Sequence, residues 1–324
     1  MLPYLSKRIG LMFLTFFVTI FLIFMFIKLM PDNHIPNLGQ EDIAYQKLKE
    51  REGWDKPIPV QFALWIKNIV TEGSFGFSHV LRADVGKYYF SKVPASIRIN
   101  LIPYFLSVPL AIAIGIIAAL YKNKWIDNLI STGIMIFISV PYFVVVVLVQ
   151  YFFYFRWKIV PDYKVATPSE FESLGFWYGA STYVMPIIVM TIVSIPSFAR
   201  VVRSELTEQL TQDYMLLARS KGLTKKQATY RHALKNALVP FLPGILIGVI
   251  GVMSGGIITE RLFRVDGTGN LYLNAFQATP PDYAMLMLIS AFTQFITLVS
   301  SIVADLSYTL FDPRIRVGSG KIAL

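Results

Sequence analysis

The sequence contains no cysteine and has few charged residues. Of its 324 residues, 15% are charged and 55% are hydrophobic, and the mean hydropathy is +0.55. A soluble domain carries about a quarter charged residues, so this composition indicates a chain that uses the lipid bilayer as its solvent. The absence of cysteine excludes disulfides, thiolate chemistry and zinc sites built on cysteine.

Histidine is also scarce, and the three histidines show no spacing typical of metal ligands. His34, His79 and His232 lie far apart in the sequence, so no metal site is predicted. The net charge of +10 predicts contact with anionic membrane lipid or with an acidic partner. Nucleic acid is not expected as a partner, because no nucleic-acid-binding module surrounds the basic residues.

Six apolar runs are long enough to cross a hydrocarbon core, which needs roughly 20 residues. The first run follows Lys7 and Arg8, as in a signal peptide, but it is too long for a signal core and we interpret it as a retained span. Pro186 and Pro196 interrupt the fourth and shortest run. The lysines and arginines of the short connections place both termini inside. The runs are approximately Ile9–Ile27, Ile99–Tyr121, Leu129–Phe155, Thr182–Phe198, Ala237–Thr259 and Met285–Phe311.

Two outer loops have a pattern of their own. In the first, "WDKPIPVQFALWIKNIV" predicts a helix after a proline-led start, and "GSFGFS" predicts a turn. The second, Arg261–Tyr283, combines a glycine-rich turn with a short amphipathic segment. Two interpretations stay open: these segments dock a partner or cap a pore, or they only cover the outer ends of the helices.

A basic insert, "ARSKGLTKKQATYRHALKNALVP", separates the fourth and fifth runs. Good helix formers over Thr207–Ser220 end before Gly222, which suits the left-handed position past a helix. Thr224 and Gln227 have the spacing of a capping box, so a second helix is predicted from Lys225 to about Leu238. The insert is either an anchor on lipid or a knob for a cytosolic protein. The knob is favoured by apolar residues that specify a shape, namely Leu216, Leu217, Ala218, Leu223 and Ala228.

The stretch "DYMLLARSKGLTKKQATYRHALKNALVP" closely resembles the cytoplasmic loop of permease subunits from ATP-binding cassette importers, in the oligopeptide, dipeptide and nickel branch. The general importer loop has Glu-Ala-Ala, three residues and Gly; here only Ala218 and Gly222 keep that pattern. "GSFGFS", "FRVDGTGNLYLNAF" and the closing "DPRIR" are similar to further family motifs. The second of these lacks the proline of the family's Pro-Gly-Leu-Gly. The resemblance covers almost the whole chain and is to the first of two permeases.

The resemblance implies an all-α integral membrane protein of the type I importer permease fold. It has six transmembrane helices, both termini in the cytoplasm and a structured first extracellular loop. Residues 1–30 form the N-terminal segment and first span, and residues 31–97 the extracellular module. Residues 98–324 form the transmembrane core, with the coupling loop at 200–236. The implied location is the bacterial inner membrane.

The implied function is that of a permease subunit for ATP-driven import of oligo- or dipeptides. Its partners are a second homologous permease, two cytosolic ATPases and an extracellular or lipid-anchored binding protein. No cofactor is expected on this chain, since ATP and Mg belong to the ATPases. The sequence has no G-x-x-x-x-G-K-[ST] loop, so the chain is not expected to be an enzyme. Import of nickel, a metal chelate or glutathione is the alternative, and a stand-alone channel a more remote one.

Several residues are candidates for these roles. The coupling candidates, within 213–236, are Asp213, Tyr214, Ala218, Lys221, Gly222, Leu223, Thr224, Arg231, His232 and Asn236. The glycines that recur on nearly one helix face, for packing or for the pathway, are Gly244, Gly248, Gly251 and Gly255. The candidates that face the binding protein are Trp54, Asp55, Phe75, Asp266 and Gly267.

Ionisable residues near the spans are a further group, because charge within a membrane is costly and is usually paired or functional. Asp305, in the sixth run, is expected to form an ion pair with Arg200 or Arg203. Glu260 and Arg261, at the outer end of the fifth run, are expected to lie within reach of water or of the binding protein.

Overall fold

The computed structural model describes residues 2–30, 46–47, 49–50 and 53–311. The "DPRIR" motif and much of the first half of the first outer loop lie outside the described residues. The contacts divide the chain into two compact units. The outer-loop unit comprises residues 2–97 and 253–299, and the hairpin unit comprises residues 98–252 and the chain from Ser300.

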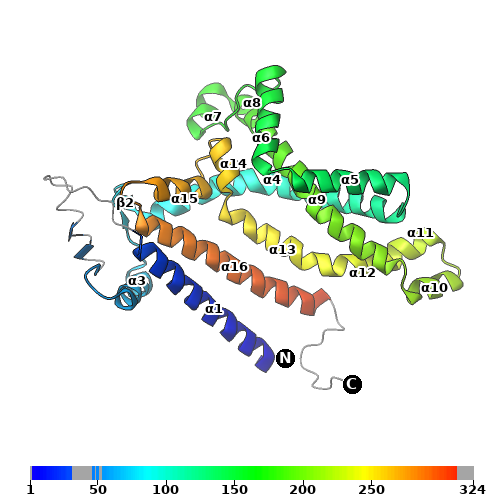
Figure 1. Ribbon diagram of the computed structural model, residues 1–324, viewed down its shortest axis with the longest axis horizontal. Coiled ribbons are helices and arrows are strands. Elements are labelled where there is room, and N and C mark those ends of the chain that lie inside the picture. Colours follow the sequence, from blue (N-terminus) through cyan, green and yellow to red (C-terminus); the bar gives the residue numbers. More distant parts are fainter. Residues whose placement is uncertain (1, 31–45, 48, 51–52, 312–324) are drawn as a thin grey trace. The chain divides into compact units, whose positions relative to one another are not determined.

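The outer-loop unit is built on helices from both ends of the chain (Figure 1). Its core buries Phe24, Tyr89 and Met285, which come from three different helices. A two-stranded antiparallel sheet pairs Phe77 with Asp84. The elements are α1 (Leu2–Lys28), α3 (Ile58–Glu72), β1 (Phe77–Ser78), β2 (Ala83–Asp84), the first part of α4 (Val85–Leu120), α14 (Ile257–Leu262), α15 (Thr268–Gln277) and the first part of α16 (Tyr283–Phe311).

Helix α3 confirms the helix predicted in the first outer loop. It begins after Pro57, whose fixed φ suits a helix start. It ends at Gly73, which has a φ of 63° and whose backbone N–H caps the last turn. The left-handed conformation at this end favours glycine, because a side chain would be strained there.

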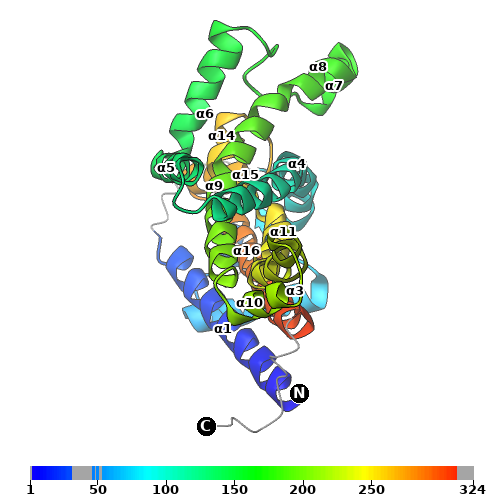
Figure 2. The same cartoon turned by 90° about the vertical axis from the view of Figure 1, so that its right-hand side faces the viewer.

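The hairpin unit contains the rest of α4 and most of the remaining helices (Figures 1 and 2). Within it, α9 packs along α5, α6 and α12. The elements after α4 are α5 (Trp125–Ser139), α6 (Tyr142–Gln150), a π-helix (Tyr151–Arg156), α7 (Pro168–Leu174), α8 (Phe176–Thr182), α9 (Val184–Gln209), α10 (Asp213–Ser220), α11 (Lys225–Ala228), a second π-helix (Thr229–Ala233), α12 (Leu234–Leu238), a 3₁₀ turn (Val239–Phe241), α13 (Leu242–Gly251) and a 3₁₀ turn (Val252–Ser254).

The third apolar run, predicted as one span, is not one straight helix. Helices α5 and α6 meet at an angle of 95° (Figure 2). The bend lies at Val140, which has an extended backbone, and Pro141. Proline has no N–H for the helix and disfavours helical geometry in the residue before it, so the helix ends there.

The fourth span is longer than predicted. Pro196 lies inside α9 without ending it, and the helix continues past the predicted boundary at Phe198 to Gln209. Among the described residues, five helical segments are long and apolar enough to cross a membrane, and the bent α5–α6 pair makes a sixth if it counts as one span. These segments are Ser6–Lys28, Val85–Leu120, Phe176–Gln209, Lys225–Ser254 and Tyr283–Ser307.

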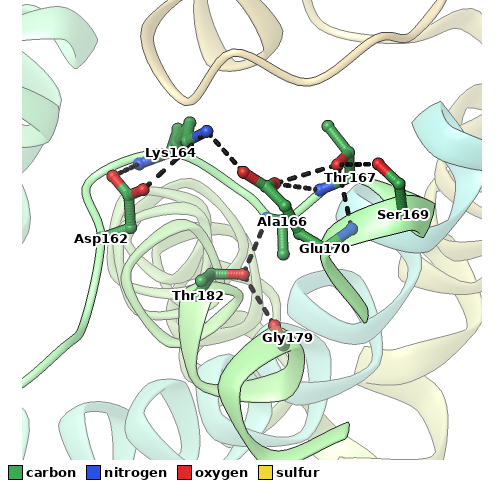
Figure 3. A network of polar contacts seen from close by, with 8 residues as sticks. All are labelled: Asp162, Lys164, Ala166, Thr167, Ser169, Glu170, Gly179 and Thr182. Carbon is green, nitrogen blue, oxygen red and sulfur yellow. Dashed lines mark hydrogen bonds and ion pairs between the residues drawn. The ribbon is translucent and has the colours of Figure 1, made fainter. Parts of the chain in front are cut away.

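The loop between the third and fourth spans is ordered by its own polar network (Figure 3). Thr167 caps α7 in a capping box with Glu170. Lys164 Nζ donates to Glu170 Oε1 at 2.7 Å. The backbone N–H of Ala166 donates to the hydroxyl of Thr182, at 3.0 Å, which ties this loop to the end of α8.

Candidate functional site

The basic insert forms a helical hairpin whose turn is fixed by backbone bonds. Helix α10 ends at Ser220, and Gly222 follows with a φ of 90°. The N–H of Gly222 donates to Arg219 O at 2.9 Å, and the N–H of Leu223 donates to Ala218 O at 3.3 Å. This pair of bonds is the Schellman motif, which satisfies carbonyls at the end of a helix. The left-handed position predicted for Gly222 is confirmed.

The second arm begins with the predicted capping box. The N–H of Thr224 donates to Gln227 Oε1 at 3.0 Å, and the N–H of Gln227 donates to Thr224 Oγ1 at 3.2 Å. Each bond satisfies a donor that a free helix end leaves without a partner. The two caps lie next to each other, so the hairpin reverses its direction within a few residues.

The first arm differs from the prediction. A single helix over Thr207–Ser220 was expected, but α9 ends at Gln209 and α10 begins only at Asp213. The intervening turn, residues 210–212, lets α10 change its direction after the long helix α9. The hairpin is therefore α10 and α11–α12, attached to the end of α9 through this turn (Figure 1).

The inner face of the hairpin is made mostly of alanine. Ala228, Ala233 and Ala237 are fully buried and pack in one cluster with Leu206 of α9 and Ala119 of α4. The π-helical turn Thr229–Ala233 adds length between the first two alanines and keeps all three on the buried face. Alanine lets helices approach closely, so the hairpin is held firmly against α9.

The outer face of α10 carries two adjacent leucines. Leu216 and Leu217 are 64% and 57% exposed, while Met215 and Ala218 point into the cluster beneath them. Leucines in this position are not needed by the core of the described chain. Tyr230, 49% exposed on the second arm, adds a third apolar side chain to the outer face of the hairpin.

The predicted coupling residues occupy three kinds of environment. Ala218 is 8% exposed and belongs to the core cluster. It therefore positions the hairpin and does not present a contact surface, which corrects its place among the candidates. Leu216, Leu217 and Tyr230 were not among these candidates, although two consecutive leucines in a basic segment are a visible signal. The exposed candidates are Asp213, Lys221, Gly222, Thr224, Arg231 and His232, and the half-buried ones are Tyr214, Leu223 and Asn236.

A second buried site surrounds Glu260 in the outer-loop unit. The prediction that water reaches Glu260 is wrong, because the residue is fully buried, whereas Arg261 is exposed as expected. Ser96 Oγ donates to Glu260 Oε1 at 2.7 Å, and the N–H of Asn270 donates to Oε2 at 2.9 Å. The N–H of Gly256 donates to Oε1 at 3.2 Å. Burial raises the pKa of the Glu260 carboxyl.

Glycines let the second outer loop close over Glu260. A Cβ at Gly267 would lie 2.5 Å from Ser96 Oγ and 2.6 Å from the carboxyl carbon of Glu260. Gly267 is buried, so it cannot face a binding protein, and that candidate is corrected. Its neighbour Asp266 is exposed and forms an ion pair with Lys92. The chemistry of this cluster is structural: a carboxylate with several donors fixes the loop.

The other candidates for the outer face lie on the first outer loop. Asp55 is exposed, as a docking residue must be. Trp54 and Phe75 are half-buried: the Trp54 ring packs edge-on against Tyr283, and the Phe75 ring packs against Phe90.

Residues 111–317 match the family described as "Binding-protein-dependent transport system inner membrane component". This match covers more than half of the chain. The chain belongs to this family. The resemblance found in its motifs is confirmed, and the chain is a permease with several membrane-spanning helices, located in the bacterial inner membrane.

Relatives of the permease match it over most of its length. It is 29% identical to the dipeptide transport system permease protein DppB of Lactococcus lactis subsp. cremoris, over 98% of this chain and 100% of that protein. It is 28% identical to the oligopeptide transport system permease protein OppB of Mycoplasma genitalium, over 99% of this chain and 78% of that protein. A solved structure of an amino acid ABC transporter with histidines has a TM-score of 0.49 and 15% identity, over 69% of this chain and 94% of that chain.

The glycines of the fifth span of the permease do not act as one group. A Cβ at Gly248 would lie 2.4 Å from the ring of Tyr104, so this glycine permits packing of α13 on α4 within the chain. Gly244 and Gly251 have open space around the Cβ position in the described chain. Gly255 lies beyond the helix with a φ of 71°, which corrects its place on the shared face.

A buried ion pair in the permease was not predicted. Arg203 Nε and Nη2 donate to the two carboxylate oxygens of Asp127 at 2.6 and 2.8 Å, which joins α9 to α5. Asp127 is 1% exposed and also accepts from the N–H of Asn123 and the hydroxyl of Ser131. Arg203, which was expected to pair with Asp305, is therefore assigned to Asp127.

Proposed function

We propose that the permease is the membrane subunit of an ATP-driven importer of short peptides. Two relatives are named as permeases of dipeptide and oligopeptide transport systems. The permease matches them over 100% and 78% of their respective lengths. The sequence has no phosphate-binding loop, so the energy of ATP reaches this chain from a partner ATPase. ATP and Mg bind on that partner, and this chain binds no cofactor.

The hairpin α10–α12 is the contact with the ATPase. The observation that carries this proposal is the pair of exposed leucines, Leu216 and Leu217, on a hairpin that is capped at its turn and packed on α9. Exposed apolar side chains on a rigid support are typical of a surface that is buried against a partner. Because the alanine face joins the hairpin to Leu206, a displacement at the hairpin moves the inner end of α9.

The remaining partners contact other surfaces of the permease. A second homologous permease packs on the face of α13 that carries Gly244 and Gly251, where small residues allow close approach. An extracellular or lipid-anchored binding protein docks on the outer-loop unit, near the exposed carboxylates of Asp55 and Asp266. The two cytosolic ATPases pair with the two permeases, one hairpin each.

The test is transport by the reconstituted complex. The permease is co-expressed with the subunits that co-purify with it, and the complex is reconstituted in proteoliposomes. The binding protein is added on the membrane side that carries the outer-loop unit. Uptake of labelled alanyl-alanine that requires both ATP and the binding protein is expected. Flux through the permease alone without ATP would instead establish a channel. Uptake of nickel, a metal chelate or glutathione with no peptide uptake would refute the peptide assignment.

A further inference from the structure

The outer-loop unit contains a cavity of about 120 Å³. Its lining residues come from the last turns of α1, the helix α3, the strand segment and the first turns of α16. Its apolar walls include Phe24 and Phe75, and its polar walls include Gln61, Trp65, Lys28 and Asp84. All of these residues belong to one unit, so the cavity is part of its packing.

Two residues that line the cavity, Gln61 and Trp65, each carry a buried polar atom with no partner in the described part of the chain. Gln61 is 7% exposed, and its Nε2 donates to Lys56 O at 2.8 Å and Trp54 O at 3.3 Å. These bonds fix which way the amide points, and they leave Gln61 Oε1 without a donor among the described residues. Trp65 Nε1, one helical turn further along α3, is buried with no acceptor among the residues that the structure describes. A buried polar group without a partner destabilises the fold unless a ligand or water satisfies it.

This pair of atoms specifies a ligand chemistry. Gln61 Oε1 requires a donor, and Trp65 Nε1 requires an acceptor. Side chains four residues apart lie on the same face of a helix, so both atoms can meet one ligand. A peptide group presents an N–H and a C=O side by side, and it satisfies both at once.

The wall also carries one residue of each charge, which complements in sign the two charged ends of a short peptide. Lys28 lines the cavity, and its Nζ lies 3.9 Å from the centroid of the Trp54 ring. Asp84 Oδ1 accepts from the N–H of Lys87 at 2.8 Å, and a carboxylate accepts more than one donor. A ligand with a carboxylate for Lys28 and an ammonium for Asp84 is a zwitterion.

We propose that this cavity binds a free peptide of about two residues. The peptide group meets Gln61 and Trp65, the carboxylate meets Lys28, and the ammonium meets Asp84. The inference deepens the proposed function, on which it rests for the class of substrate. It places a peptide site on the extracellular module of the permease itself, in addition to any site on a binding protein.

The experiment measures binding to the full-length permease in nanodiscs, with its co-purifying subunits and without the binding protein. Alanyl-alanine is titrated by calorimetry, and saturable binding is expected. Trp65→Phe keeps the ring and removes one donor, so it should weaken binding about fivefold, the effect of one neutral hydrogen bond. The matched control is Trp177→Phe, at a tryptophan that is 83% exposed in the other unit, and it should leave the affinity unchanged.

A blocked peptide separates the roles of the amide and the charges. N-acetyl-alanyl-alanine amide lacks both charges, so its binding should be weaker and should no longer respond to Lys28→Met or Asp84→Asn. Its binding should still weaken in Trp65→Phe. Free alanine has no peptide group and should bind more weakly than alanyl-alanine.

Three results would overturn the inference: no saturable binding of alanyl-alanine, an unchanged affinity in a folded Trp65→Phe variant, or equal binding of free alanine. The thermal unfolding midpoint of each variant verifies that it folds. A complex that imports alanyl-alanine but shows no binding without the binding protein refutes this site and leaves the proposed function standing. A complex that binds alanyl-alanine but imports no peptide refutes the proposed function and leaves the site.

Discussion

The two leucines on α10 allow a quantitative test of the hairpin as an ATPase contact. Replacing both with alanine removes about three methylene equivalents from each side chain. At about 0.8 kcal/mol for each methylene buried, the full effect is about 2.4 kcal/mol per leucine. Only the exposed fractions, 64% and 57%, remain to be buried by a partner. The expected loss is therefore about 3 kcal/mol for the pair, or roughly 150-fold in affinity for the ATPase.

The assay compares the ATPase affinity of the Leu216→Ala/Leu217→Ala permease with that of the wild type in nanodiscs. Because both side chains already face solvent, the thermal unfolding midpoint should barely change. Leu174 on α7 is 56% exposed on the outer side of the membrane, so Leu174→Ala is the matched control and should bind the ATPase normally. If the double variant bound the ATPase within threefold of the wild type, the assignment of this surface would be wrong.

Three further predictions concern other features. Gly222→Ala should lower the free energy of opening of the hairpin turn, measured by hydrogen exchange, by about 1–2 kcal/mol. Gly222→Asn should lower it by less, because a φ of 90° disfavours side chains but tolerates asparagine best. Equal effects of the two variants would contradict this prediction. Asp127→Leu alone should destabilise the permease by about 3 kcal/mol, which is the low end for a buried pair because Arg203 is 30% exposed. Adding Arg203→Met should restore much of that stability, as measured by thermal unfolding. Additive losses in the double variant would refute the pairing. The hydrogen bond from Lys164 lowers the pKa of Glu170 to about 2, so its stabilisation of the α7 loop is present above its ordinary pKa of 4.5 and is lost as the pH falls toward 2. Hydrogen exchange of this loop should show that loss in the wild type and not in Glu170→Gln.

Local signals in the sequence were sufficient for the hairpin turn. The capping box of Thr224 and Gln227 and the left-handed Gly222 each depend on residues within three or four positions, and both are confirmed. The apolar length of the third run predicts a span, and Pro141 lies where α5 and α6 bend away from each other. Proline alone does not predict such a break, because Pro196 lies inside α9 without ending it.

Features that depend on distant residues could not be predicted. Asp127 and Arg203 are 76 positions apart, and nothing near either residue indicates its partner. Glu260 directly follows the fifth apolar run, so its exposure to water was the natural expectation. Its burial depends on Ser96 and on the N–H of Asn270, which only the folded loop brings to it.

The turn of the hairpin also bears on how such transporters diversify. Its reversal depends on backbone bonds, on Gly222 and on the Thr224–Gln227 box, while its attachment depends on buried alanines. Neither set includes Leu216, Leu217 or Tyr230, which are exposed. These three positions can therefore change during evolution without altering the fold. On the proposed ATPase contact, duplicated transporters could acquire separate ATPases by substitution on this surface.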